Sequence, residues 1–201
     1  MITGELLTEY GAQKITLEKN EQLFSEGDTA RYYYQVALGS IKVINYGDDG
    51  KEFVQGIFKN GQSLGEPPLF GGFTYPATAI ALEKTEAYKL EFKKLLNLLK
   101  ENFEVHLEIT RTLSKRLNYK SLILKEISSY APEHRIMALF QHLQSEDEKD
   151  STGHYEIKFT RQQIASLTGL RVETVIRAIK ALEAQGKVEI NNRRVYLLES
   201  K

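Results

Sequence analysis

The order of apolar and polar residues from about position 15 to position 90 is typical of short β-strands. Apolar and polar side chains alternate at Ile41–Val43, aromatic and β-branched residues fill Tyr32–Val36, and Ala77–Leu82 is a further apolar segment. Asp48–Gly50 is typical of a hairpin turn, and glycine recurs between the segments at positions 27, 39, 47, 50, 56, 61, 65, 71 and 72. Short strands with close turns predict a β-roll, jelly roll or sandwich and almost exclude a helix here.

From Phe92 to about Ser128 the pattern changes to that of a helix. The segment contains no Gly or Pro and is rich in Leu, Lys and Glu, so the sequence predicts one long helix. At 1.5 Å per residue such a helix spans about 54 Å, which is longer than a small domain needs.

One face of this predicted helix has the alternating three- and four-residue spacing of a coiled-coil seam. The seam positions are Phe103, His106, Thr110, Leu113, Leu117, Lys120, Leu124 and Ile127. A second row, formed by Leu96, Leu99 and Leu107, can face the β domain. The helix is either buried within one chain or paired with a second copy, and the unused seam favours a parallel homodimer.

After residue 131 the sequence pattern predicts a series of short helices and strands. They are a helix that begins at Pro132, a strand at Tyr155–Phe159, a helix at Arg161–Leu167, a helix at Arg171–Gln185 and a hairpin at Lys187–Leu198 around Asn191 and Asn192. Thr160 and Gln163 have the capping-box spacing, and Gly169 lies in the tight turn between the last two helices. This order predicts a winged helix-turn-helix.

The side chains of these two helices divide into an inward and an outward set. The residues that can pack the helices together are Ile164, Ala165, Leu167, Leu170, Val175 and Ile179. The polar residues left on the exposed half of the second helix are Arg171, Glu173, Thr174, Arg177 and Lys180. Arg can bind guanine with two hydrogen bonds and Glu can accept one from cytosine, so this face fits the major groove of DNA.

Charge is unevenly distributed along the chain. The formal net charge is zero, which by itself does not favour nucleic-acid binding, but residues 158–194 hold eight basic and three acidic residues, a local charge of +5. A basic field over the helix-turn-helix segment is what a surface that faces phosphates requires.

Composition excludes several kinds of site. The chain has no cysteine, which rules out disulfides, thiolate metal sites and cysteine-bound iron–sulfur clusters. His106, His134, His142 and His154 lack metal-ligand spacing, and no nucleophile–base set is apparent, so we expect neither a metal site nor an enzyme. There is no signal-peptide pattern and no apolar stretch long enough to span a membrane, so we expect a cytoplasmic protein without membrane association.

The whole chain resembles the Crp/Fnr superfamily of bacterial transcription regulators. In the strand-rich part, Leu23–Asp28, Val36–Val43 and Gly61–Glu66 are similar to the signature of the cyclic-nucleotide-binding domain. In the last part, Ile157–Ala165 and Gly169–Arg177 are similar to the family's helix-turn-helix. The agreement of these segments in the family's order makes the resemblance specific.

The resemblance implies a role for each residue on the DNA-binding face. Glu173 and Arg177 stand where the family's two principal base readers stand, and they imply a TTGA- or GTGA-like half-site. Val172 and Ile176 stand at the neighbouring base-reading positions, where Val172 replaces the Arg of the cAMP receptor protein and Ile176 replaces the Ser of Fnr-type proteins. The implied phosphate contacts are Arg161, Gln162, Arg171, Thr174 and Lys180. The implied partners are double-stranded DNA, a second copy of the chain and RNA polymerase.

The resemblance also identifies a degenerate effector pocket. Gly65 and Glu66 match the start of the family's phosphate-binding cassette, but Pro76 and Ala77 replace its Arg-Ser end, which neutralises the cyclic phosphate. The Thr-Ser pair that faces adenine in relatives becomes Lys120 and Ser121. We therefore expect no cAMP cofactor, and either another small-molecule effector or none.

Two residues of the predicted helix keep several interpretations open. Lys120 either extends past the seam or pairs with a Glu of the roll, provides a cation for an anionic effector, or fixes the register of the dimer. Haem binding through His106 is a further, less favoured interpretation.

The sequence therefore predicts an α+β protein in three parts. They are a sensor β-roll with flanking helices at residues 1–91, a long dimerisation helix at 92–129 and a winged helix-turn-helix at 130–201. The predicted function is sequence-specific transcription regulation by a homodimer. The alternative is a ligand-binding or interaction module whose C-terminal domain docks protein instead of DNA, and the polar face of the second helix argues against it.

Overall fold

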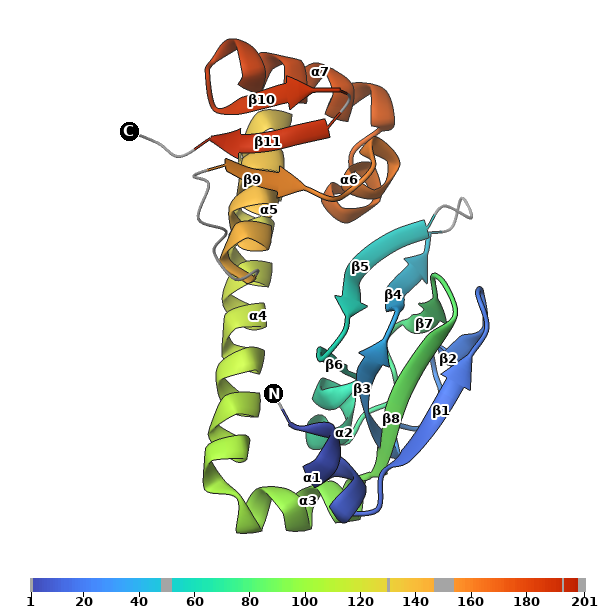
Figure 1. The fold of residues 1–201 in the computed structure, drawn as a ribbon. Coiled ribbons are helices and arrows are strands. Elements are labelled where there is room, and N and C mark those ends of the chain that lie inside the picture. Colours follow the sequence, from blue (N-terminus) through green and yellow to red (C-terminus); the bar gives the residue numbers. More distant parts are fainter. Residues whose placement is uncertain (1, 48–51, 130, 147–153, 193, 199–201) are drawn as a thin grey trace. The chain divides into compact units, whose positions relative to one another are not determined.

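The chain forms two compact units, residues 1–114 and 115–201. The computed structural model describes residues 2–47, 52–129, 131–146, 154–192 and 194–198. The boundary falls inside the long helix α4 (Phe103–Ser129), so this helix contributes its first part to one unit and its second part to the other. The predicted α+β class, with a strand-rich first unit and a helix-turn-helix in the second, is confirmed (Figure 1).

The first unit contains two four-stranded antiparallel sheets. One has the strand order β1-β8-β3-β6, and its strands are β1 (Gln13–Leu17), β8 (Thr85–Glu91), β3 (Tyr32–Leu38) and β6 (Ser63–Leu64). The other has the order β2-β7-β4-β5, and its strands are β2 (Gln22–Phe24), β7 (Thr78–Ala81), β4 (Ser40–Tyr46) and β5 (Glu52–Lys59). The three segments expected to be strands are β3, β4 and β7. The predicted hairpin turn at residues 48–50 lies outside the described residues.

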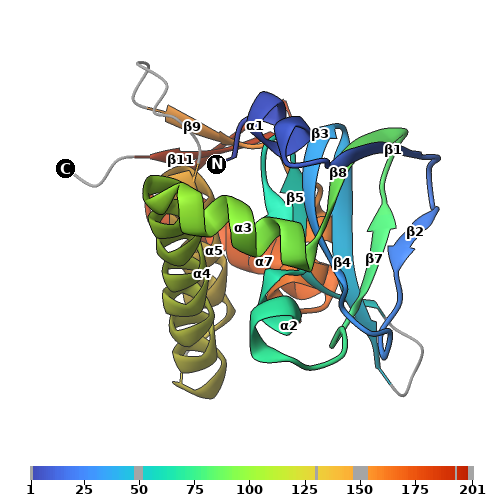
Figure 2. The same ribbon diagram turned by 90° about the horizontal axis from the view of Figure 1, so that it is seen from below.

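Two cores stabilise this unit. The first includes Tyr34, Val36 and Ile41 from the two sheets. The second forms where the helices α1 (Gly4–Glu9) and α3 (Phe92–Glu101) cover the sheet that contains β3 and β8, as Figure 2 shows. Tyr33 belongs to this second core while its neighbour Tyr34 belongs to the first, because successive side chains of a strand point to opposite faces.

The sequence pattern almost excludes a helix between residues 15 and 90, and this expectation is wrong at one place. Residues Glu66–Gly71 form the short helix α2, which has proline in its first turn. Gly65 precedes it with a φ of 82°, a left-handed conformation that glycine adopts without the steric cost of a side chain. A six-residue helix is too short to show an apolar period, so the pattern could not reveal it.

The predicted continuous helix over residues 92–129 is also wrong, because it breaks at Asn102. The Asn102 side-chain amide donates to the Leu98 carbonyl at 2.9 Å and to the Tyr10 hydroxyl at 3.3 Å. Asn is able to end a helix in this way because its short side chain bonds the neighbouring backbone. Before the break, α3 buries Leu95, Leu98 and Leu99, whereas Leu96, which we expected to face the β domain, is exposed.

The second unit contains the C-terminal part of α4, three further helices and a three-stranded antiparallel sheet of order β10-β11-β9. The elements are α5 (Pro132–Glu146), β9 (His154–Ile157), α6 (Arg161–Thr168), α7 (Val172–Ala184), β10 (Val188–Asn191) and β11 (Arg194–Leu198). One core of apolar residues joins α5, α6, α7 and the sheet, with Phe140, Ile164 and Val175 fully buried. No helix among the residues that the structure describes is long and apolar enough to cross a membrane.

Candidate DNA-binding interface

The helix α6 begins with the capping box that the sequence predicts. The backbone N–H of Gln163 donates to the Thr160 hydroxyl at 3.2 Å, and the Thr160 N–H donates to the Gln163 side-chain oxygen at 2.8 Å. Both bonds satisfy donors that the first turn of a helix leaves without partners. The start of α6 is thereby fixed by its own sequence.

A tight turn at Gly169 connects α6 to α7. Gly169 has a φ of 68° and caps α6, its N–H donating to the carbonyl of Ala165. The Leu170 N–H donates to the same carbonyl at 3.1 Å. Only a residue without Cβ takes this left-handed conformation without strain, so Gly169 allows α7 to start directly after the turn.

The helix α7 separates a buried face from an exposed polar face. Val175, Ile179 and Leu182 are buried in the core, as the sequence predicts. On the other face Glu173, Arg177, Lys180 and Ile176 are exposed, and Ile176 is 41% accessible. Because α-helical residues three and four apart lie on one side, these four form one continuous strip at the start of α7.

Two of the proposed contact residues on α7 are less exposed than this strip. Val172 is half-buried and packs against the core, so only part of its side chain faces outward, and Thr174 is also half-buried. Arg171 is the exposed N-cap residue of α7, although its side chain does not cap the helix. Their neighbour Glu173 lies in the first turn, where a negative charge suits the helix dipole.

Two of the predicted phosphate contacts, Arg161 and Gln162, lie in the first turn of α6. Gln162 is exposed and Arg161 is half-buried. Partial burial lowers the pKa of the Arg161 guanidinium from its ordinary value. An arginine keeps its charge at neutral pH even so, because its unperturbed pKa lies far above that range.

The hairpin β10–β11 forms the wing. Its turn contains Asn192 with a φ of 48°, and the basic residue Arg193 lies outside the described residues. The Arg194 guanidinium pairs with the Glu156 carboxylate at 2.9 Å across β11 and β9. The Glu183 carboxylate of α7 accepts from the Ile190 N–H at 3.1 Å, which joins the wing to the helix.

The residues of the predicted dimer seam lie along α4, and most are exposed in the single chain. Phe103, Leu117 and Leu124 are 69%, 67% and 68% accessible. His106, Thr110 and Lys120 are also exposed. Leu113 differs, because it is half-buried and packs against the core of the first unit. The side chain of Ile127 lies outside the described residues.

The residues predicted to form a degenerate effector pocket fall into both units. In the first, Glu66 is buried and accepts a hydrogen bond from the Ser63 hydroxyl. Pro76 is exposed and its carbonyl accepts from the Asn45 amide at 2.7 Å, while Ala77 is buried. A Cβ on Gly65 would lie 3.2 Å from the Tyr75 ring, so Tyr75 occupies the space beside it.

Lys120 and Ser121 belong to α4 in the second unit, and both are exposed. The Ser121 hydroxyl donates to the Leu117 carbonyl within the helix at 3.0 Å. Gly65, Glu66, Pro76 and Ala77 belong to the first unit, so the six predicted residues are divided between the two units.

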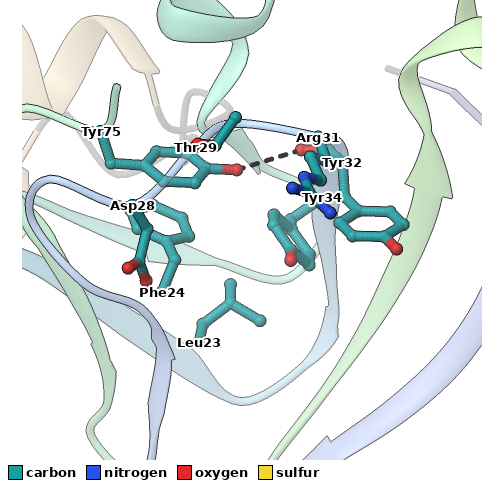
Figure 3. Close-up of a pocket in the computed structure, with 8 residues that line it drawn as sticks. All are labelled: Leu23, Phe24, Asp28, Thr29, Arg31, Tyr32, Tyr34 and Tyr75. Atoms are coloured by element: carbon teal, nitrogen blue, oxygen red, sulfur yellow. Dashed lines mark hydrogen bonds between the residues drawn. The ribbon is translucent and has the colours of Figure 1, made fainter. Parts of the chain in front are cut away.

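The structure forms a pocket in the first unit that no sequence motif predicted. It has a volume of about 280 Å³ and is lined by Leu23, Phe24, Asp28, Thr29, Arg31, Tyr32, Tyr34 and Tyr75 (Figure 3). Its residues come from β2, the segment that leads into β3, β3 itself and the segment before β7. The aromatic residues Tyr32–Tyr34 are the signal in the sequence, but their pattern predicts only a strand.

Comparison with known families gives two matches, in chain order. The family model of the cyclic nucleotide-binding domain matches residues 14–102, and that of the Crp-like helix-turn-helix domain matches residues 134–200. The first covers both sheets of the roll, and the second covers α6, α7 and the wing.

Relatives of known role match across most of the chain. The transcriptional activator protein anr of Pseudomonas aeruginosa is 25% identical over 186 residues, which cover 92% of this chain and 76% of the relative. The cAMP-activated global transcriptional regulator CRP of Haemophilus influenzae is 29% identical over 175 residues, covering 86% and 78%.

Solved structures share the fold. The c-di-GMP responsive global regulator CLP of Xanthomonas campestris superposes with a TM-score of 0.73 at 24% identity, over 96% of this chain and 99% of its own. A mutant of CooA from Carboxydothermus hydrogenoformans gives a TM-score of 0.79 at 19% identity, over 100% and 88%. From the two domain matches in order and the regulators that match over most of its length, the chain belongs to the Crp/Fnr family of transcription regulators and carries its helix-turn-helix DNA-binding domain.

Proposed function

We propose that this regulator reads a palindromic TTGA- or GTGA-like site with the exposed strip of α7. The observation that carries the proposal is that Glu173 and Arg177 lie one helical turn apart and exposed, above a buried face that fixes the helix. The Arg177 guanidinium can donate twice to guanine, and the Glu173 carboxylate can accept from cytosine. Ile176, together with the outward part of Val172, offers apolar contact to the thymine methyl group.

The residues proposed to contact phosphate lie at the start of α6, at the N-cap of α7 and on α7, and they include Lys180, the last residue of the strip. Each of these residues is at least partly exposed. They are Arg161 and Gln162 at the start of α6, Arg171 at the N-cap of α7, and Thr174 and Lys180 on α7. Contacts of this kind fix the position of a protein on DNA without selecting a sequence. We assign the phosphate contacts to DNA affinity. The base readers Glu173, Arg177, Ile176 and Val172 are assigned to sequence specificity.

The active form in this proposal is a homodimer joined along α4. The exposed leucines and Phe103 of the seam support it, because large apolar side chains at coiled-coil spacing are stabilised when a second helix covers them. A two-fold symmetric protein also matches a palindromic site. Family membership supports RNA polymerase as a further partner and the bacterial cytoplasm as the place of action.

The proposed effector is a molecule other than cAMP, or the protein acts without one. Relatives in this family include a cAMP-activated and a c-di-GMP responsive protein, so the nucleotide is not fixed by the fold. In this chain the family's cassette ends in Pro76, which has no N–H, and in Ala77, which has no hydroxyl. A cyclic phosphate would lose its charge-assisted partner there, at a cost of roughly 1.5–3 kcal/mol.

Selection of bound fragments from random DNA tests the proposal. We expect enrichment of an inverted repeat whose half-sites contain TTGA or GTGA, and gel shifts on the selected site that weaken steeply as salt rises. Retention of DNA without an enriched sequence would contradict specific reading. Failure to retain DNA at any salt concentration would favour the protein-docking alternative.

A further inference from the structure

The pocket of Figure 3, here called the aromatic pocket, is built by a segment that crosses from β2 to β3. Its backbone is bonded to the segment before β7, with the Gly27 N–H donating to the Tyr75 carbonyl and the Tyr75 N–H to the Asp28 carbonyl, both at 2.9 Å. Thr29 and Thr74 form an antiparallel bridge beside these bonds. The frame of the pocket is therefore held by the backbone and exists without a ligand.

Aromatic rings form the wall of the pocket. Phe24 and Tyr75 are stacked with ring centroids 3.8 Å apart, and Phe24 and Tyr34 lie 5.9 Å apart in a tilted arrangement. Tyr32 lies 6.3 Å from Tyr34 and completes the group. Flat, rigid side chains of this kind present ring faces and edges to a planar molecule at low entropic cost.

A cation, Arg31, lines the same pocket. Figure 3 shows its side chain together with Tyr32, Tyr34 and Tyr75 among the residues that line the pocket. Within residues 2–47, 52–129, 131–146, 154–192 and 194–198 its guanidinium has no hydrogen-bond or ion-pair partner. The Lys89 ammonium lies 4.1 Å from the centre of the Tyr32 ring and adds positive charge. Because a guanidinium donates through a planar fork, Arg31 suits a carboxylate.

The acidic side chain of the pocket is already engaged. The Asp28 carboxylate accepts from the Ser25 N–H at 2.9 Å and closes the turn after β2. Asp28 thus has a structural role that does not use the Arg31 guanidinium.

The Tyr34 hydroxyl supplies a further polar group. Tyr34 is only 5% accessible, it lines the pocket, and its hydroxyl has no hydrogen-bond partner in the described part of the chain. Burial raises the pKa of Tyr34 to about 12, with the nearby Tyr32 and Asp28 acting in the same direction. The hydroxyl therefore keeps its proton at neutral pH and can donate to a bound oxygen.

From this geometry we propose that the aromatic pocket binds a small planar aromatic carboxylate. The ring lies against the aromatic wall, the carboxylate pairs with Arg31, and the Tyr34 hydroxyl donates to the same anion. A volume of about 280 Å³ lies at the small end of ligand pockets and suits a single-ring molecule. The site differs from the degenerate effector pocket, since it contains none of Gly65, Glu66, Pro76 and Ala77.

The test is a titration of 4-fluorobenzoate with the full chain, followed by fluorine NMR in the absence of DNA. We expect saturable broadening that unlabelled benzoate reverses. Acetate, which lacks the ring, and 4-fluorobenzyl alcohol, which lacks the charge, are expected to bind at least ~10-fold more weakly. Because no DNA is present, the result is independent of the proposed DNA-binding function.

Variants assign the binding to this pocket. Arg31→Gln is expected to lower the affinity for 4-fluorobenzoate ~10- to 100-fold. Tyr34→Phe, which keeps the ring, is expected to lower this affinity a few-fold. The matched control is Arg111→Gln, which removes the same charge from an exposed arginine of α4 that pairs with Glu108. Absence of saturable binding, equal affinity in the wild type and Arg31→Gln, or equal affinity for acetate and benzoate would each overturn the proposal.

Discussion

The ring of Tyr119 lies face to face on the ring of His142, with centroids 3.6 Å apart and planes inclined by 11°. Tyr119 belongs to α4 and His142 to α5, so the stack joins these two helices inside the second unit. Tyr119 also packs against the core that supports α6 and α7. The core that supports α7 is therefore packed against a residue of α4, the helix proposed for dimerisation.

Tyr119→Ala is expected to destabilise the second unit by ~3 kcal/mol, because it removes a large half-buried ring together with its stack. Tyr119→Phe keeps the ring and is expected to stay within ~1 kcal/mol of the wild type. Urea unfolding followed by circular dichroism measures both differences. Equal midpoints for the two variants would show that the ring does not support the unit.

Stability is expected to fall at alkaline pH because of buried tyrosines. Burial raises the pKa of Tyr34 from 10.0 to about 12, so between these values the folded chain keeps a proton that the unfolded chain has released. Folding stability from this group is fully present below pH 10 and is lost as pH rises towards 12, by ~1.4 kcal/mol for each unit. Tyr34→Phe is expected to match the wild type at pH 8 and to lose less stability at pH 11, as measured by urea unfolding.

Leu117→Glu is expected to produce monomers that lose specific DNA affinity, because it places a charge at the centre of the proposed α4 seam. Light scattering measures the molar mass, and gel shifts measure binding. Asn118→Glu is the matched control, since Asn118 is exposed one residue away on the same helix but is not a seam position. A dimer that survives Leu117→Glu would place the interface elsewhere.

We expect the proposed base-reading and phosphate-contact roles on α7 to be separable by mutation. Arg177→Ala is expected to cost about 1–3 kcal/mol on the selected site and to relax the preference at one G·C pair in each half-site. Lys180→Ala is expected to weaken all sequences alike and to reduce the slope of affinity against salt. Gel shifts on matched and mismatched sites across a salt series distinguish them. Identical behaviour of the two variants would refute the division of roles.

Neither cAMP nor cGMP is expected to bind tightly to the roll or to change DNA affinity. Pro76 and Ala77 leave no guanidinium or hydroxyl for the cyclic phosphate, and a ligand shifts an equilibrium only through different affinities for the two states. Titration calorimetry measures the binding. A dissociation constant near or below ~10 μM, corresponding to ~7 kcal/mol, would contradict the expectation and direct attention to Lys120 as the replacement cation.

The helix-turn-helix was predictable because its signals are local. Thr160 and Gln163 are three residues apart, Gly169 occupies the turn, and the inward positions of α7 repeat at helical spacing. Each of these features is decided by neighbours in the sequence, so no long-range contact was needed to place α6 and α7.

The aromatic pocket and the helix break depend on contacts between distant segments. Tyr75 is brought to Phe24 by the pairing of β2 with β7, which no local pattern encodes. At the break, Asn102 is bonded to Tyr10, a residue from the beginning of the chain. Leu113 has the same spacing as its seam neighbours, yet part of its surface is used by the core of its own unit.

Because the helix breaks at Asn102, the directions in which the α4 side chains point do not depend on the number of residues in α3. In a continuous helix of 3.6 residues per turn, an inserted residue rotates everything after it by about 100°. Here the Asn102 amide ends α3 on the Leu98 carbonyl, and a new helix begins at Phe103. Insertions or deletions before Asn102 can therefore be absorbed without turning Phe103, Leu117 and Leu124 away from the proposed partner helix. The first unit can diverge in length while the proposed pairing face of α4 keeps its direction.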